Sequence, residues 1–182
     1  MKMNYVFALV GKSGTGKTTL SKVIGRELSI PVHVTYTTRH PRHTERDGVD
    51  YHFVTVDEFT DIEMVEQVEF DGNWYGTGKQ SFEQIMHDNK ASIIVVEETG
   101  LKRLQSLYGK KIIAILLEME GVTRFELLTR RDGKQAARKR WGTDLRLRFS
   151  EVKINHTIYE DGENWIEVKN EITKIIRKKL KQ

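Results

Sequence analysis

The stretch Gly11-Lys12-Ser13-Gly14-Thr15-Gly16-Lys17-Thr18 decides the fold of this chain. It matches the pattern G-x-x-x-x-G-K-[ST], the P-loop, in which glycines let the backbone curl so that successive N–H groups face phosphate oxygens. The apolar run 4–10 before it predicts a buried strand, and the apolar spacing after it predicts a helix over 17–28. A glycine-rich turn that fits the pattern by chance is the alternative, and the strand and helix on its two sides argue against it.

The P-loop predicts a site for ATP. Its lysine, Lys17, is expected to reach the β- and γ-phosphates, and the hydroxyl of Thr18 is expected to ligate Mg²⁺. The positive N-terminal end of the following helix favours the same phosphates. Mg²⁺ is therefore the expected cofactor, with ATP as the phosphoryl donor. The residues expected to bind ATP are Gly11, Ser13, Gly14, Thr15, Gly16, Lys17, Thr18 and Thr19.

The rest of the chain alternates strands with helices. The apolar runs 92–96 and 111–117 predict two more buried strands, and the stretch 56–65 predicts a short helix. Because strands that alternate with helices form a parallel sheet covered on both faces, the expected fold class is α/β. Two stretches break the alternation, residues 37–77 and a basic block at 124–148. We expect both to be functional insertions on the core.

Composition restricts the class of protein. A chain of 182 residues with 38% hydrophobic and 31% charged residues can form one domain with a substantial core. Cysteine is absent, no apolar run is long enough to span a membrane, and the apolar stretch near the N-terminus lacks the small-residue cleavage site of a signal peptide. We therefore expect a cytoplasmic protein, a monomer or homodimer, with no membrane partner. The basic block has nine Lys and Arg residues against three Asp and Glu, which suits a phosphate-rich ligand or nucleic acid.

Three strings downstream of the P-loop carry residue types suited to a nucleoside monophosphate. They are Thr35-Tyr36-Thr37-Thr38-Arg39-His40-Pro41-Arg42, Asp47-Gly48-Val49-Asp50-Tyr51-His52-Phe53-Val54 and Gly72-Asn73-Trp74-Tyr75-Gly76-Thr77. A monophosphate is a dianion near neutral pH, and arginines with tyrosine hydroxyls can surround it with charge-assisted hydrogen bonds. In content and spacing the strings resemble the GMP-binding region of guanylate kinases, and weaker similarity extends over most of the chain.

The resemblance implies a set of residues for GMP. Glu66 stands where the family has the glutamate that binds guanine, whose N1–H and N2–H₂ donors pair with a carboxylate as adenine cannot. Glu63 and Glu69 lie close by, so a register shift of three residues stays open. Glu97 stands where the family usually has Asp, at a strand end that faces the crevice of the sheet, and could order Mg²⁺-bound water or the acceptor base. The residues expected to bind GMP are Thr35, Arg39, Arg42, Tyr51, Glu66, Tyr75, Thr77 and Glu97.

The basic block resembles a lid that closes over the phosphates. Added arginines stabilise the charge of the transferred group, and closure excludes water. The usual R-G-T-E string of the family is here Arg130-Arg131-Asp132-Gly133, about one residue shorter. An exposed helix with surface charge is the alternative. The residues expected to be catalytic are Lys17, Arg42, Arg130 and Arg140.

Together these features predict an ATP-dependent kinase that phosphorylates GMP to GDP by direct in-line transfer. The expected division is a core of residues 1–34, 81–128 and 142–182, a GMP-binding insertion at 35–80 and a lid at 129–141. A kinase for another nucleoside or deoxynucleoside monophosphate, or a guanylate-kinase-like binding module without catalysis, remains open. A nucleic-acid binder has little support because Trp141 stands almost alone among the basic residues.

Overall fold

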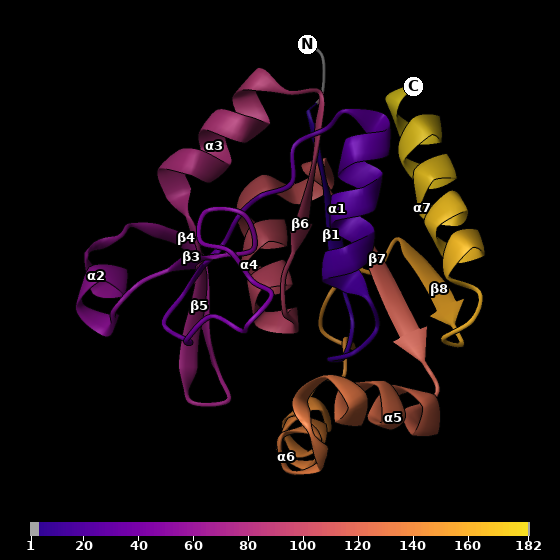
Figure 1. Cartoon of the computed structure of the whole chain (residues 1–182). Helices are drawn as coiled ribbons and strands as arrows, with labels where there is room; N and C mark the ends of the chain where they lie inside the picture. The colour runs from indigo at the N-terminus through magenta and orange to yellow at the C-terminus, as the bar shows by residue number, and fades with distance from the viewer. Residues whose placement is uncertain (1–3, 182) are drawn as a thin grey trace.

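Four parallel strands form the central sheet, in the order β6-β1-β7-β8 (Figure 1). They are β1 (Tyr5–Val10), β6 (Ala91–Val95), β7 (Ile112–Met119) and β8 (His156–Glu160). The computed structural model describes residues 4–181; residues 1–3 and 182, the ends of the expected core, lie outside the described residues. All six residues of β1 are buried because the sheet is covered on both faces. The predicted α/β fold class and the three predicted strands are confirmed.

Helices cover the two faces of this sheet. On one face, α1 (Lys17–Leu28) and α7 (Trp165–Leu180) pack against Phe7 and Leu9 of β1. On the other, α3 (Lys79–Asp88) and α4 (Glu98–Tyr108), which a short helical turn (η1, Gly109–Lys111) connects to β7, pack against Val6 and Ala8. The alternation of side chains along β1 thus builds two separate hydrophobic layers. In the part of the chain that the structure describes, no helix has the length and hydrophobicity needed to cross a membrane.

The predicted insertion contains a second sheet, with strand order β3-β2-β5-β4. Its elements are β2 (Tyr36–Thr37), β3 (His52–Phe53), α2 (Val56–Asp61), β4 (Met64–Phe70) and β5 (Asn73–Gly78). The helix predicted over 56–65 is correct only as far as Asp61, because Ile62 takes an extended conformation and the chain continues into β4, which pairs antiparallel with β5. This sheet holds the three strings at 35–42, 47–54 and 72–77, here called the acceptor strings, beside the carboxyl ends of the core strands.

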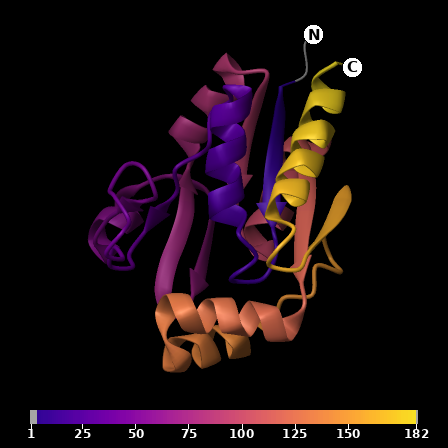
Figure 2. The same ribbon diagram turned by 45° about the vertical axis from the view of Figure 1, so that its right-hand side comes forward.

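Two helices lie across the lower end of the molecule, beneath the carboxyl ends of the parallel strands (Figure 2). These lid helices are α5 (Gly121–Asp132) and α6 (Lys134–Asp144). The chain reverses between them at Gly133, whose φ of 82° favours glycine. The predicted lid at 129–141 falls inside this pair. The helical pair is therefore longer than the predicted lid and contains most of the basic block.

Candidate active site

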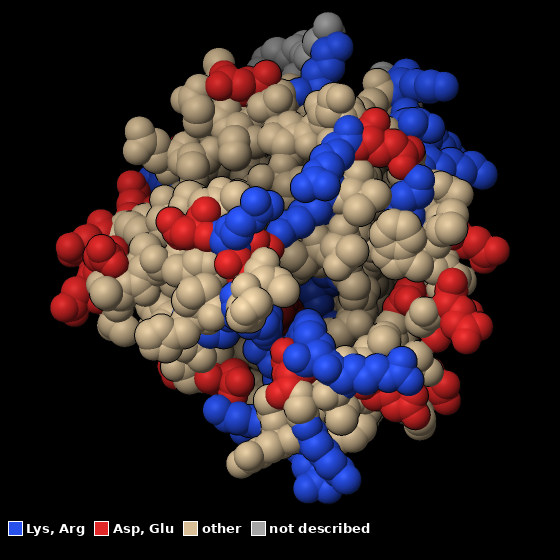
Figure 3. Space-filling model, in the orientation of Figure 1, with Lys and Arg blue, Asp and Glu red and all other residues tan. Residues whose placement is uncertain are grey.

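A cleft opens between the core sheet, the second sheet and the lid helices. Figure 3 shows Lys and Arg side chains gathered around a hollow on this face. Both sheets contribute to its walls, so residues distant in the sequence meet there. The lining residues are Ser13, Thr35, Arg39, Arg42, Tyr51, Glu66, Val68, Phe70, Tyr75, Gly76, Val95, Val96, Glu97 and Arg140.

The P-loop forms one end of the cleft, between β1 and α1. Gly11 has a φ of 143°, and a Cβ there would meet the backbone oxygen of Leu117, so only glycine fits. The Nζ of Lys17 donates to the carbonyl oxygens of Gly11 at 2.6 Å and Lys12 at 2.9 Å. Burial lowers the pKa of Lys17, although the nearby carboxylates of Glu97 and Asp144 act in the opposite direction. The lysine is thus held by the carbonyl groups of the loop itself.

Two arginines of the first acceptor string share one carboxylate. Arg39 donates from Nη2 to both oxygens of Glu45 at 2.9 Å, and Arg42 donates from Nη1 to Oε1 at 3.1 Å. The side chain of Arg39 is only 13% exposed, and its guanidinium lies 5.5 Å from the centre of the Tyr51 ring. The Tyr51 and Tyr75 rings are in edge contact at 6.0 Å. Glu45 therefore orients the two arginines, and the two tyrosines line the same cleft beside them.

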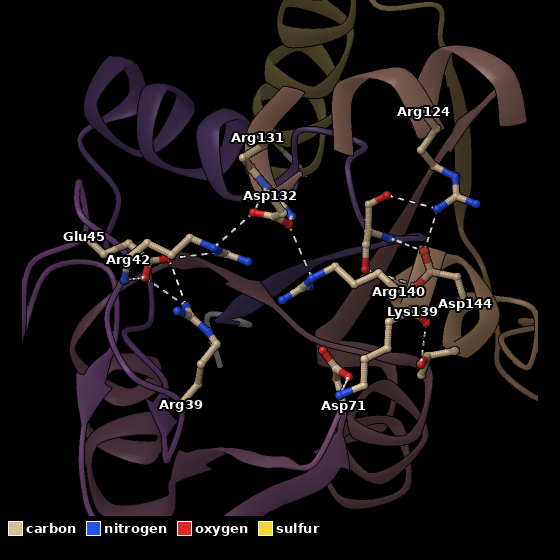
Figure 4. Close-up of polar contacts among 12 residues, drawn as sticks. Arg39, Arg42, Glu45, Asp71, Arg124, Arg131, Asp132, Lys139, Arg140 and Asp144 are labelled. Carbon is tan, nitrogen blue, oxygen red and sulfur yellow. Dashed lines mark hydrogen bonds and ion pairs between the residues drawn. The ribbon is translucent and has the colours of Figure 1, made fainter. Parts of the chain in front are cut away.

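Asp132, at the end of α5, connects the lid to Arg42 of the insertion. Its carboxylate lies 3.4 Å from Nε of Arg42, 3.4 Å from Nε of Arg140 and 2.6 Å from Nη2 of Arg131 (Figure 4). Desolvation raises the pKa of Asp132, but the hydrogen bond from Arg131 and the surrounding guanidinium charges outweigh it, so the pKa is lowered. Three arginines around one anion mark a place suited to phosphate oxygens.

Glu66 is buried at the floor of the cleft, with 7% of its surface exposed. Its Oε1 accepts a 2.5 Å hydrogen bond from the hydroxyl of Thr77 on β5. Gly100 of α4 lies against the carboxyl group so closely that a Cβ at this position would overlap Oε2. Burial raises the pKa of Glu66 to about 7, with the charge of Glu97 acting in the same direction. The site therefore holds a carboxyl group close to its titration point near neutral pH.

Glu97 follows the end of β6 and lies in the same cleft. Burial raises its pKa, and its Oε2 is buried without a hydrogen-bond partner among the described residues. Thr18, the first residue after Lys17 in α1, is exposed. A carboxylate and a hydroxyl are hard oxygen donors that fit Mg²⁺, which typically takes one or two protein ligands and completes its shell with phosphate oxygens and water. Among the described residues, no group of three or more His, Cys, Asp or Glu side chains lies together in a way that could hold a metal by itself.

The structure brings most of the predicted residues together. Of the eight predicted for GMP, all except Thr77 line the cleft, and Thr77 contacts it through Glu66. Arg140 lines it as well, whereas Arg130 is exposed and lies outside the lining set. Sequence reasoning missed Glu45 and Asp132 as partners of the arginines. For Glu45 a signal exists, because it stands only three residues after Arg42, just beyond the first string. For Asp132 the sequence offers no equivalent signal.

A second cleft lies on the other side of the P-loop. Apolar side chains make up much of its wall, and two P-loop residues, Lys12 and Thr15, form its edge. The remaining lining residues come from the end of β7 and the residue after it, from the segment before β8 and from β8 itself. They are Leu116, Leu117, Glu118, Met119, Glu120, Leu147, Arg148, Phe149 and Tyr159.

Comparison with known proteins agrees with this geometry. Residues 3–177 match the family model described as guanylate kinase. This chain belongs to the guanylate kinase family. Its relatives include a guanylate kinase of Clostridium acetobutylicum, 30% identical over 185 residues, with 96% of this chain and 84% of that protein covered. A guanylate kinase of Dechloromonas aromatica is 33% identical over 126 residues, which cover 65% of this chain and only 62% of the relative.

A solved guanylate kinase has the same fold. The crystal structure from Anaplasma phagocytophilum superimposes with a TM-score of 0.71, covering 100% of this chain and 89% of that one. Sequence identity with it is 20%, so this match concerns the fold alone. Several curated guanylate kinases are matched over about half to two thirds of their length, so the match with them is partial.

Proposed function

We propose that this chain is an enzyme that transfers the γ-phosphoryl group of ATP to GMP, forming ADP and GDP. The observation that carries the proposal is the single cleft in which Ser13 of the P-loop, the arginines Arg39 and Arg42, and Glu66 lie together. Phosphoryl transfer requires the two nucleotides to meet end to end, and a cleft that joins a P-loop to a cationic cradle permits this. Membership of the guanylate kinase family supports GMP as the acceptor.

The acceptor phosphate is assigned to the cationic wall of the cleft. Arg39 and Arg42 carry the charge, and Tyr51 and Tyr75 supply hydroxyl donors. Glu45 holds both arginines through a shared carboxylate, so their guanidinium groups are oriented before the phosphate arrives. Such preorganisation reduces the reorganisation that binding would otherwise require.

The guanine base is assigned to Glu66. Its carboxylate can accept from the N1–H and N2–H₂ groups of guanine, and adenine lacks that pair of donors. Thr77 supports the assignment because its hydroxyl donates to Oε1 and orients the carboxyl group. Thr35 lines the same cleft and supplies a further hydroxyl for the base.

The donor triphosphate is assigned to the P-loop, Gly11 to Thr18, and to the next residue, Thr19. Lys17 would exchange its bonds to loop carbonyl groups for the β- and γ-phosphates, while Thr18 and Glu97 would hold Mg²⁺ directly or through water. When bound, Mg²⁺ neutralises phosphate charge. The adenosine part is assigned to the second cleft, whose apolar wall and Arg148 suit a purine face.

Transfer needs no covalent enzyme intermediate. An oxygen of the GMP phosphate attacks the γ-phosphorus, and the bond from that phosphorus to the β–γ bridging oxygen breaks, so that ADP leaves with the electron pair. Lys17, Arg42 and Arg140 stabilise the charge on the moving group from the loop, the insertion and the lid. We assign Arg130 a supporting place in the lid that depends on movement of α5, because it is exposed here.

We also propose a cytoplasmic location, in keeping with a cysteine-free sequence, and a protein that acts as a monomer or homodimer. Neither bears on the chemistry of the cleft.

The proposal is tested by a coupled assay for ADP release with ATP, Mg²⁺ and each of GMP, AMP, CMP and UMP in turn. Turnover is expected with GMP well above the other three. Lys17→Ala should lower kcat by roughly 10²- to 10³-fold, since it removes a group that stabilises transition-state charge. The matched control is Lys102→Ala, which removes an exposed lysine on α4 and should leave turnover unchanged.

Two results would contradict the proposal. Preference for AMP, CMP or UMP would retain phosphoryl transfer and reject the assignment of Glu66 to guanine. A folded protein that binds ATP but turns over none of the four acceptors would instead be a nucleotide-dependent binding module.

A further inference from the structure

Asp144, the last residue of α6, makes a set of contacts that the proposed reaction does not use. Its Oδ2 accepts from the backbone N–H of Ser13 at 3.1 Å and from Nη1 of Arg124 at 2.5 Å, and its Oδ1 accepts from the Ser13 hydroxyl at 3.1 Å. The side chain of Asp144 is 1% exposed and that of Arg124 is 4% exposed. A carboxylate of the lid is thus bound to the backbone of the P-loop, with its charge matched away from solvent (Figure 4).

Arg124 completes the contact from α5. Its Nη1 also donates to the backbone oxygen of Ser13 at 3.1 Å, so the lid holds both the N–H and the C=O of one P-loop residue. The guanidinium lies 4.3 Å from the centre of the Trp141 ring, which also packs against the first turn of α5 at Gly121. Gly14 also lies against Arg124, because a Cβ at Gly14 would be 3.3 Å from Cγ of Arg124. The lid helices therefore sit directly on the turn Ser13–Gly14.

This turn lies between the two clefts to which the nucleotides are assigned, because Ser13 lines the first and Lys12 and Thr15 line the second. Ser13 lines the acceptor cleft, and the residues that follow it form the phosphate-binding loop. The direction of the Ser13 peptide influences where the next N–H groups point, because they follow it in a tight turn. The same two helices carry Asp132, which pairs with Arg42 of the insertion, and Arg140, which pairs with Asp132. A rotation of the Ser13 peptide and a shift of the lid are therefore linked through Asp144 and Arg124.

We propose that Asp144 and Arg124 are positioning residues that hold the Ser13 peptide in the conformation that receives the triphosphate of ATP and align the lid arginines with it. The inference deepens the proposed function and rests on it for the identity of the donor, ATP. Asp144 does not touch the nucleotide in this arrangement; it acts through Ser13. The competing interpretation is that the Asp144 carboxylate occupies a phosphate position and is displaced by ATP.

The experiment measures ATP binding directly, by calorimetry with Mg²⁺ and no acceptor. Asp144→Asn keeps the size of the side chain and removes its charge, and should raise the Kd for ATP about tenfold because a charge-assisted contact to the loop is lost. Ser13→Ala removes only the hydroxyl contact and should raise it about threefold. The matched control is Glu151→Gln, which breaks an exposed ion pair with Lys102 and should leave the Kd for ATP unchanged.

A double variant separates positioning from stability. Arg124→Met with Asp144→Leu replaces a buried ion pair by apolar groups of similar size, a change that often recovers stability. We expect its thermal unfolding midpoint to lie above that of Asp144→Asn, while the Kd for ATP stays about tenfold raised because Ser13 has lost its partners. In turnover assays the KM for ATP should rise and the KM for GMP should stay within about twofold of that of the unmodified protein.

Three outcomes would overturn the inference. Tighter ATP binding by Asp144→Asn would show that the carboxylate competes with phosphate. Recovery of ATP affinity together with stability in the double variant would reduce the pair to a structural contact. An unchanged Kd for ATP in both Ser13→Ala and Asp144→Asn would mean that the contact between Ser13 and Asp144 has no influence on ATP binding. Because ATP binding is measured without GMP, failure of GMP turnover in the unmodified protein would reject the proposed acceptor and leave this test intact.

Discussion

Glu66 on the acceptor side of the cleft and Asp144 on the donor side are both buried carboxyl groups, but their surroundings differ. Glu66 has one neutral partner, the hydroxyl of Thr77, and burial raises its pKa to about 7. Asp144 accepts three hydrogen bonds, one of them from the guanidinium of Arg124. A carboxyl group with unused hydrogen-bonding capacity can receive a ligand, whereas one whose partners come from the chain orients the chain.

The largest expected effect that tests this contrast is the loss of the Glu66 charge. Glu66→Gln should lower kcat/KM for GMP by roughly 10²- to 10³-fold, because an amide cannot accept from both guanine donors and each charge-assisted bond is worth about 1.5–3 kcal/mol. Steady-state kinetics with GMP and IMP should also show that the preference for GMP shrinks, since IMP lacks the N2 amino group.

The neighbouring Glu69 provides the matched control. It is exposed on β4, three residues further along, and Glu69→Gln should leave the kinetics unchanged. A loss at Glu69 and not at Glu66 would mean that the family register is shifted by three residues.

The next effect is a dependence of stability on pH. The pKa of Glu66 is raised from 4.5 to about 7, so between these pH values the folded protein keeps a proton that the unfolded chain releases. The free energy of unfolding should therefore fall as pH rises through this window, by at most about 3 kcal/mol from this group. Urea unfolding at pH 4.5, 6 and 7.5 measures the slope, and Glu66→Gln should make it smaller. An unchanged slope in that variant would place the pKa of Glu66 in its ordinary range.

Removal of the hydroxyl partner gives a smaller change. Thr77→Val conserves shape but removes the bond that lowers the pKa of Glu66, so the carboxylate form becomes less populated at neutral pH. We expect kcat/KM for GMP at pH 7 to fall about tenfold, with the pH profile displaced upward. Thr60→Val is the control, because the Thr60 hydroxyl bonds only to its own helix at the exposed face of α2. An unchanged pH profile of kcat/KM in Thr77→Val would mean that the Thr77 hydroxyl does not affect the pKa of Glu66.

The smallest effect is expected at an exposed contact between lid and insertion. Lys139 of α6 lies 2.6 Å from Asp71 in the β4–β5 turn, but its side chain is 68% exposed. Lys139→Gln should change KM for GMP by less than about threefold, since water and salt screen such pairs. Kinetics at low and high salt check this. A large, salt-resistant effect would mean that this bridge, and not the buried contact at Ser13, sets the position of the lid.

Much of the fold could be predicted because its signals are local. The P-loop and the three acceptor strings each place chemical groups within a few residues, and their backbone conformations follow from glycines and short strands. Seven of the eight residues predicted for GMP accordingly line one cleft. The helix predicted over 56–65 is wrong after Asp61 because pairing with β5 outweighs local helical spacing.

The lid shows where local signals end. Its family string is altered at Arg130-Arg131-Asp132-Gly133, and the sequence alone could not tell which arginine enters the cleft. The structure directs Arg140 inward and leaves Arg130 exposed. It also places Asp132 among three arginines, a contact between lid and insertion that no spacing rule contains.

By itself, the sequence determined the class of fold, the phosphate-binding loop and the residue types of the acceptor site, because each depends on groups that are neighbours along the chain. Only the tertiary structure decided the pairing of Asp144 with Ser13, 131 residues away, and with Arg124. The physical reason is desolvation. A charge that folding removes from water must find its partner in space, and that partner is set by how helices pack on the sheet.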